Sequence, residues 1–190
     1  IVNDLNVFPV PDGDTGDNMY LTINGGLNNL KNINENAIGA KAEALANGML
    51  LNARGNSGVI LSQFFYGIAL SLKDKINADT KVIAEAFKEG VNKAYASVVN
   101  PVEGTMLTVI REATENAINN LEKNESIGEF FNYYLNEMQS SLDRTPDLLF
   151  SLKEADVVDS GGKGLVYIVE GMKSAIEGKE IEQNEEKVTQ

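Results

Sequence analysis

Three aspartates, Asp12, Asp14 and Asp17, stand close together in the stretch "PVPDGDTGDNM". Carboxylates at such spacing repel one another unless a positive charge lies among them. The sequence contains no histidine and no cysteine, so a metal bound by this chain must have oxygen ligands. Oxygen ligands suit hard cations such as Mg²⁺, Mn²⁺ and Ca²⁺. The spacing therefore predicts a carboxylate site for a hard cation.

Three known loop types with similar letters do not fit. An EF-hand loop counted from Asp12 would need Glu at its twelfth position, where this chain has Ile23. In the D-x-D-x-T motif of haloacid-dehalogenase-type phosphatases, the threonine comes one position later than Thr15 does here. A Walker-type loop needs a hydroxyl after its lysine, where "GGKGL" has Gly164. Two interpretations remain: a Mg²⁺ site beside a phosphate-binding helix N-terminus, or a simple turn in which Asp14 or Thr15 caps the helix.

Four predicted helices begin directly after a glycine-containing or small polar turn. These turns are "DGDTGDNM", "ARGNSGV", "VEGTMLT" and "VVDSGGKGL". The first N–H groups of a helix have no partner inside the helix, and the helix dipole is positive there, so such an end can bind an anion. Each turn alone is weak evidence, because Gly, Asn and Ser are common in ordinary turns. The four ends converge on one ligand if alternate helices of an antiparallel bundle run in the same direction.

Apolar residues recur at helical period along most of the chain, and no segment alternates as a strand does. The pattern predicts an all-α domain of about eight helices. The expected ranges are 17–30, 37–53, 56–74, 78–98, 104–123, 126–144, 145–155 and 159–178.

Several residues have specific expected roles in these helices. The apolar stripe of the first helix is expected to comprise Met19, Ile23, Leu27 and Leu30. The expected helix starts are Asp79 and Thr80, the capping pair Ser126 and Glu129, and Thr145 ahead of Pro146. The expected core aromatics are Phe64, Phe65, Tyr133 and Tyr134, and the expected surface ion-pair partners are Arg111 and Arg144.

The composition is that of a folded, acidic domain. The 190 residues are 43% hydrophobic, enough for one proper core. A formal net charge of −12 repels nucleic acid and anionic lipid, so neither is expected as a primary partner. No apolar run approaches the roughly 20 residues of a membrane helix, and no signal peptide is visible. We therefore expect a cytoplasmic protein without membrane insertion.

The ends of the chain indicate a piece of a longer protein. The sequence starts at Ile1 without Met, shortly before the aspartate motif. We expect one domain over residues 1–178. Residues 179–190 are expected to be a charged tail or the start of a linker, with additional C-terminal domains in the full-length chain.

In order along the chain, "NVFPVPDGDTGDNM", "ARGNSGVILSQ", "GTMLTVIREA", "RTPDLL" and "VVDSGGKGLVY" resemble the DhaL (Dak2-type) nucleotide-binding domain of dihydroxyacetone kinase. The resemblance runs from about Asn3 to Gly178 and is closer to the branch that forms the N-terminal domain of bacterial fatty acid kinase A. It implies an antiparallel barrel of about eight helices, with ATP or ADP at one end and two Mg²⁺ ions between carboxylates and phosphates.

The resemblance also implies roles for individual residues. Asp12 and Asp14 match metal ligands, and Asn6 is the best match for a third aspartate of the dihydroxyacetone kinase branch. The residues matched to phosphate contacts are Thr15, Gly16, Asp17, Asn18, Asn56 and Ser57, with Asp17 as either an extra carboxylate or a helix cap. The residues matched to the base, ribose or rest of the nucleotide are Met106, Arg144, Asp159, Ser160 and Gly161.

The function implied by the resemblance is ATP·Mg-dependent phosphoryl transfer. A fatty acid carboxylate is the expected acceptor, presented by a DegV-type fatty-acid-binding protein. A carboxylate is already ionised at neutral pH and needs no general base, which agrees with the absence of histidine. The alternatives are an activity like that of dihydroxyacetone (glycerone) kinase, or a nucleotide-sensing coactivator module without turnover.

Overall fold

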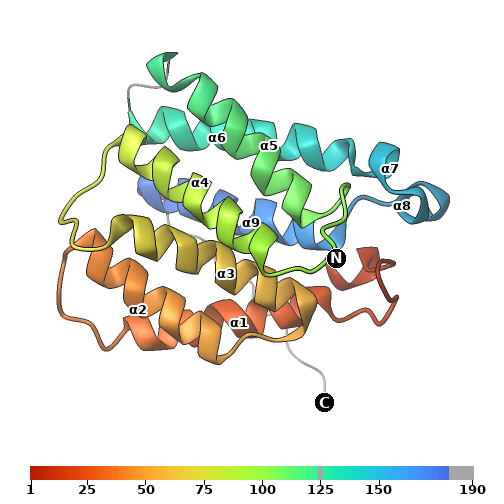
Figure 1. The fold of residues 1–190 in the computed structure, drawn as a ribbon, viewed down its shortest axis with the longest axis horizontal. Coiled ribbons are helices and arrows are strands. Elements are labelled where there is room, and N and C mark those ends of the chain that lie inside the picture. Colours follow the sequence, from red (N-terminus) through yellow and green to blue (C-terminus); the bar gives the residue numbers. More distant parts are fainter. Residues whose placement is uncertain (124–125, 180–190) are drawn as a thin grey trace.

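This computed structural model describes residues 1–123 and 126–179. These residues form nine α-helices, with connecting loops and no β-strand (Figure 1). The helices are α1 (Thr15–Leu30), α2 (Ile38–Leu51), α3 (Gly55–Leu72), α4 (Thr80–Ala96), α5 (Met106–Asn119), α6 (Ile127–Asp143), α7 (Thr145–Leu148), α8 (Phe150–Ala155) and α9 (Ser160–Ile176). Two 3₁₀-helices cover Asn3–Leu5 and Leu121–Lys123. The all-α prediction is therefore confirmed.

Seven of the helices close into an antiparallel barrel. Each of α1 to α6 contacts the next in sequence, α6 contacts α9, and α9 returns to α1. The helices α1, α3, α5 and α9 run in one direction, and α2, α4 and α6 run in the other (Figure 1). Within the described ranges, no helix is long and apolar enough to cross a bilayer.

Aromatic side chains from three helices fill the centre of the barrel. The ring of Phe87 on α4 lies 5.0–5.9 Å, centroid to centroid, from Phe64 on α3 and from Phe130, Phe131 and Tyr134 on α6. All five rings are buried, and burying each contributes roughly 1.5–3 kcal/mol. These contacts hold α3 against α4 and α6, and the start of α3 is one of the helix ends that form the site.

The buried face of α1 differs from the predicted stripe. Met19 is buried as expected, but Leu27 is exposed, and the buried set is Thr15, Met19, Thr22 and Gly26. Small residues occupy this face because α1 and α2 approach closely. A Cβ on Gly26 would lie 2.6 Å from the side chain of Met49 on α2. The closeness of the two backbones, rather than side-chain size, selects the buried face.

Two of the predicted helix caps are confirmed. Asp79 Oδ1 accepts a hydrogen bond from the Val82 N–H at 2.9 Å, and Ser126 and Glu129 form a reciprocal capping box. The predicted cap Thr145 is wrong. Thr145 is the first residue of α7, and its buried hydroxyl donates to the Leu142 carbonyl at 2.7 Å instead.

The single helix predicted over 145–155 is two short helices. Leu149 has an extended backbone, with φ −127° and ψ 110°, and separates α7 from α8. This α7–α8 segment projects from the end of the barrel at which α9 begins (Figure 1). Of the tail predicted over 179–190, residues 180–190 lie outside the described residues.

Candidate functional site

A cavity of about 550 Å³ opens at the end of the barrel where α1, α3, α5 and α9 begin. Its lining includes first-turn residues of all four helices: Thr15 and Asn18, Asn56 and Ser57, Met106 and Leu107, and Ser160 and Gly161. The predicted convergence of four helix starts is therefore observed. The volume is within the range of small-molecule sites.

Two carboxylates of the aspartate motif, Asp12 and Asp14, line this cavity and are exposed to it. Neither side chain has a hydrogen bond or ion pair with another described residue. Among the described residues, no lysine or arginine lines the cavity, while Asp159 adds a third carboxylate. An anionic ligand in this cavity therefore needs a cation to offset the negative charge.

The acidic side chains can supply only part of a cation site. Among residues 1–123 and 126–179, no three Asp or Glu side chains are grouped closely enough to hold a metal by themselves. Mg²⁺ commonly takes one or two carboxylates and completes its shell with phosphate oxygens and water. The free pair Asp12 and Asp14 fits that pattern, so the residues present fit a cation bound together with a phosphate ligand.

The start of α1 is capped from outside the helix. Asn3 Oδ1 accepts hydrogen bonds from the N–H groups of Gly16, at 2.7 Å, and Asp17, at 3.2 Å. Asp14 occupies the N-cap position without a side-chain capping bond, so its carboxylate is free. The Gly16 and Asp17 N–H groups, predicted to bind phosphate, already have this acceptor, and neither residue lines the cavity.

Asn6 shapes the loop that carries the aspartates. It is buried, its Oδ1 accepts from the Asp14 N–H at 3.2 Å, and its Nδ2 donates to the Val10 carbonyl at 3.0 Å. Asn6 lines the cavity, but it could bind a metal only by sharing this Oδ1. Its observed role is to hold Asp14 in place.

A single carboxylate caps both α5 and α9. Asp159 Oδ2 accepts from the Gly162 N–H at 2.7 Å, and the Met106 N–H at the start of α5 also donates to this side chain. The Asp159 N–H in turn donates to the Thr145 hydroxyl at 3.1 Å. Burial outweighs these hydrogen bonds and raises the pKa of Asp159 to about 6. The first turns of α5 and α9 are thus partly satisfied by the protein itself.

Of the four helix starts at the cavity, the start of α3 is the one to which no described side chain gives a cap. Its N-cap residue, Arg54, makes no side-chain capping bond, and no oxygen of the described residues accepts from the N–H groups of Asn56 or Ser57. Gly55 has φ +61°, a conformation that favours glycine, and a Cβ there would lie 2.5 Å from Asn18 Nδ2. Among the four converging helix starts, α3 is therefore the most open to an anion.

Thr22 fixes the start of α3 against α1. Its buried hydroxyl donates to the Asn18 carbonyl at 2.7 Å and accepts from the Arg54 N–H at 3.2 Å. The two helix starts that carry Asn18 and Asn56 are held together by these bonds. The polar part of the cavity is consequently built on a rigid support.

Arg144, predicted to contact the nucleotide, does not line the cavity. Its guanidinium Nη2 donates to Glu112 Oε2 at 2.7 Å, and the same oxygen accepts from the Ser141 hydroxyl at 2.7 Å. The alternative interpretation of Arg144 as an ion-pair partner describes this structure. Arg111 is likewise an ion-pair partner, as predicted, and its partner is Glu103.

Sequence reasoning missed the loop between α4 and α5 as a wall of the cavity. Ser97, Val98, Val99, Asn100 and Val102 all line it. The sequence singled out only the second half of this loop, in the turn "VEGTMLT", and gave no signal of a site at residues 97–101. Phe8, Pro9 and Val10 line it on the side of the aspartate loop.

Glu103 anchors this loop between α4 and α5. Its carboxylate accepts from the Tyr95 hydroxyl at 3.1 Å, from Arg111 Nη2 at 2.9 Å and from the Thr108 hydroxyl at 2.7 Å. The Thr108 hydroxyl also accepts from the Gly104 N–H at 2.8 Å. Burial raises the pKa of Glu103, but these hydrogen bonds outweigh it, so the pKa lies below the usual value. The loop is fixed by a charged anchor outside the cavity.

Fold and site together define a helical barrel domain with an acidic cavity at the end where alternate helices begin. The chain belongs to the DAK2 domain family, which its residues 9–174 match.

Relatives and a solved structure are similar to this chain over nearly its whole length. An uncharacterized protein of Staphylococcus haemolyticus is 44% identical over 188 residues, covering 99% of this chain and 34% of the relative. One from Staphylococcus aureus strain USA300 is 44% identical over 182 residues, covering 96% and 33%. This chain thus spans about a third of the length of these relatives. The dihydroxyacetone kinase from C. freundii, solved with AMP-PNP and Mg²⁺, has a TM-score of 0.66 and 18% identity, covering 92% of this chain and 30% of that one.

Proposed function

We propose that this domain binds ATP together with Mg²⁺ and transfers its γ-phosphoryl group to an acceptor carried by another protein. The observation that carries the proposal is the cavity: it combines an open α3 start and two free carboxylates with no lysine or arginine. A triphosphate in that environment requires divalent cations. The neighbouring dihydroxyacetone kinase, solved with AMP-PNP and Mg²⁺, supports the same ligand class for this fold.

Each part of the cavity has a defined task in this proposal. Asp12 and Asp14 would hold the cations, which supply positive charge to the phosphates and to the transferring group. The N–H groups of Asn56 and Ser57 would donate to phosphate oxygens. The buried Met106 and the adjoining Gly161 offer an apolar surface suited to a nucleobase. Positioning and charge stabilisation, rather than a general base, are the chain's own contributions.

The proposed acceptor is a fatty acid carboxylate, presented by a DegV-type fatty-acid-binding protein. A carboxylate oxygen attacks the γ-phosphorus, a new O–P bond forms, and the bond to the bridging oxygen breaks, which leaves ADP and an acyl phosphate. The acceptor is ionised at neutral pH, so no proton has to be removed. Support for this acceptor comes from the resemblance of the motifs to fatty acid kinase A.

The cation assignment predicts the effect of removing both free carboxylates. Asp12→Asn with Asp14→Asn should weaken Mg²⁺-dependent AMP-PNP binding by roughly a hundredfold or more, because neutral amides are poor Mg²⁺ ligands. Calorimetric titration measures this. Asp17→Asn is the matched control, since it removes a carboxylate of the same motif outside the cavity and should leave the affinity unchanged. Unchanged affinity in the double variant would reject the assignment.

The second candidate function is nucleotide sensing without turnover. It is favoured because no lysine or arginine of residues 1–123 and 126–179 lines the cavity to assist transfer. The full-length protein, ATP, Mg²⁺ and the fatty-acid-loaded DegV-type protein separate the two functions. A kinase releases ADP in proportion to acyl phosphate formed. Nucleotide binding without any ADP release would establish the sensor instead.

A further inference from the structure

Exposed apolar side chains gather around the mouth of the cavity. Val10, Val59, Val99 and Val102 line the cavity and are also exposed to solvent, and Leu148 and Phe150 are exposed on the adjoining α7–α8 segment. We call these six residues the apolar rim. Single exposed apolar residues are ordinary on protein surfaces, but a concentration of them around one opening indicates an interaction site.

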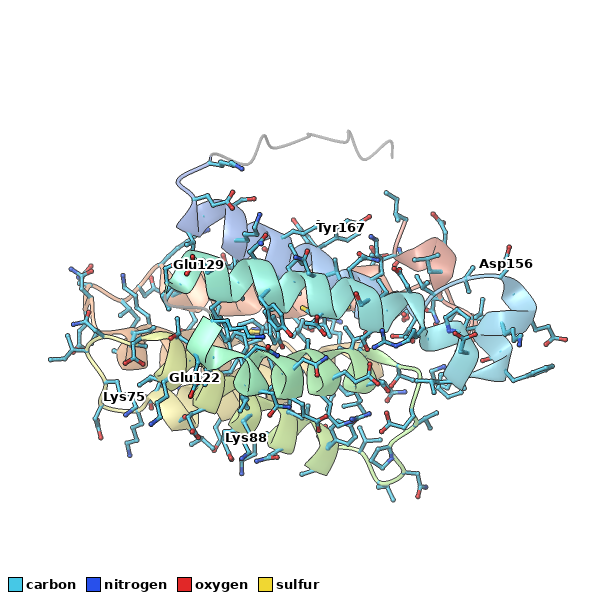
Figure 2. The ribbon with its side chains drawn as sticks, turned by 90° about the horizontal axis from the view of Figure 1, so that it is seen from above. Lys75, Lys88, Glu122, Glu129, Asp156 and Tyr167 are labelled. Atoms are coloured by element: carbon cyan, nitrogen blue, oxygen red, sulfur yellow. The ribbon has the colours of Figure 1, made fainter. Side chains whose placement is uncertain are left out.

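The rim is continuous from the cavity to the α7–α8 segment. A Cβ on Gly104 would lie 3.0 Å from the Cβ of Leu148, so the loop that carries Val102 packs against α7. Phe150, at the start of α8, is 75% exposed. At the opposite end of the barrel, Leu27, Ile33, Leu70 and Ile176 are 36–43% exposed, and Ile76 is the one described large apolar residue there with more than half of its surface exposed. Figure 2 labels its neighbour Lys75 at that end and Asp156 at the rim end.

The exposure of the rim fits a protein surface better than a small ligand. Val99 is 95% exposed, so almost no protein surrounds it. A small apolar molecule touching Val99 would stay largely in water, whereas a partner protein would cover the whole rim. Covering it removes apolar surface from water, which drives most protein–protein association.

The charges beside the rim specify the partner further. On α7, α8 and the C-cap of α8, Asp147, Glu154 and Asp156 are exposed, against one exposed lysine, Lys153. Arg144 at the end of α6 is paired with Glu112. This acidic border repels an anionic membrane surface and attracts a basic protein surface.

We infer that the apolar rim is the docking surface for the protein that carries the phosphoryl acceptor, and that this protein presents an apolar patch bordered by lysine and arginine. The inference rests on the proposed phosphoryl transfer, because docking there would hold the acceptor over the cavity mouth. Beyond that proposed function, it identifies the residues that contact the partner and the charge of the partner's surface.

The test compares apolar-to-polar changes at the two ends of the barrel. Leu148→Ser with Phe150→Ser removes the part of the rim that does not line the cavity. Ile76→Ser is the matched control, because Ile76 is 72% exposed and lies at the opposite end. Full-length proteins are titrated with the fatty-acid-loaded DegV-type protein by biolayer interferometry, and with AMP-PNP·Mg²⁺ by calorimetry.

The double variant should bind the loaded DegV-type protein roughly tenfold or more weakly, since a few large side chains buried on association carry most of the affinity of an interface. Ile76→Ser should bind it as the wild type does, all three proteins should bind AMP-PNP·Mg²⁺ equally, and added salt should weaken docking. Wild-type affinity in the double variant, or no docking by the wild type, would overturn the inference.

Two comparisons separate partner docking from nucleotide binding and from lipid binding. If the wild type fails to bind AMP-PNP·Mg²⁺ but the double variant still loses docking, the proposed function fails and the docking surface stands. Vesicles of phosphatidylcholine with phosphatidylglycerol test a membrane role. Vesicle binding by the wild type that the double variant loses, with docking unaffected, would overturn the inference in favour of a lipid surface.

Discussion

The carboxylate of Asp159 joins the starts of two helices at the cavity. It accepts hydrogen bonds from the N–H groups of Gly162 and Met106, and the positive ends of both helix dipoles point at it. Burial works against the charged form, and it is the larger effect. Asp159 is therefore an organiser of α5 and α9 that carries an electrostatic cost at neutral pH.

This balance predicts how stability depends on pH. Burial raises the pKa of Asp159 to about 6 from 3.8 in the unfolded chain, so between these values the folded state binds more protons. Its contribution to the free energy of unfolding therefore falls as pH rises through that window. Between about pH 4.5 and about pH 7.5 the loss is roughly 2 kcal/mol.

Asp159→Asn isolates this contribution, because an amide oxygen can still accept from Gly162 but does not titrate. Urea unfolding of both proteins at the two pH values measures it. Relative to wild type, the variant should gain about 2 kcal/mol at the higher pH, while the other carboxylates cancel in the comparison. An equal pH dependence in both proteins would contradict this account of Asp159.

At the scale of helices, close packing at glycines sets the shape of the barrel. Gly67 on α3 faces Gly90 on α4, and a Cβ on Gly67 would lie 2.4 Å from the Glu89 carbonyl oxygen. Backbone atoms cannot move aside as a flexible side chain can. The α3–α4 pair therefore depends on the missing Cβ.

Gly67→Ala should lower the free energy of unfolding by about 1–3 kcal/mol or more, because α3 and α4 must separate. Gly128→Ala on α6 is the control, since no atom of the described residues beyond its chain neighbours and its own helix backbone lies within 4 Å of the added Cβ. Alanine there should leave stability unchanged or raise it by up to about 1 kcal/mol, as expected for a helix. Thermal unfolding of both variants measures the two changes in stability. Equal changes in the two variants would argue against close packing at Gly67.

Local sequence signals predicted the helices well and their long-range contacts poorly. The caps at Asp79 and Ser126 were predictable because donor and acceptor lie within three residues. The cap of α1 was not, because Asn3 lies thirteen positions before Gly16 and only the folded chain joins them. Thr145 is a residue type that often caps helices, but in the folded chain its hydroxyl accepts a hydrogen bond from the N–H of the distant Asp159.

At the scale of the whole molecule, the antiparallel barrel turns four weak turn motifs into one site. The sequence indicated Asp12, Asp14 and Asn56 at such a site, and all three line the cavity. It did not reveal that Asn3 and Asp159 cap three of the four helix starts, nor that Arg144 pairs with Glu112. These caps and this ion pair depend on how the helices pack together, and the residue types at a single turn do not determine that packing.

We propose that Mg²⁺·nucleotide binds in the cavity, with phosphate at the start of α3. An amide ¹H–¹⁵N NMR titration of this chain with AMP-PNP, with and without Mg²⁺, tests it most directly. We expect the largest shift changes at Asn56 and Ser57 and in the loop around Asp12 and Asp14, and only when Mg²⁺ is present. Changes of equal size without Mg²⁺, or changes confined to residues outside the cavity, would contradict the account.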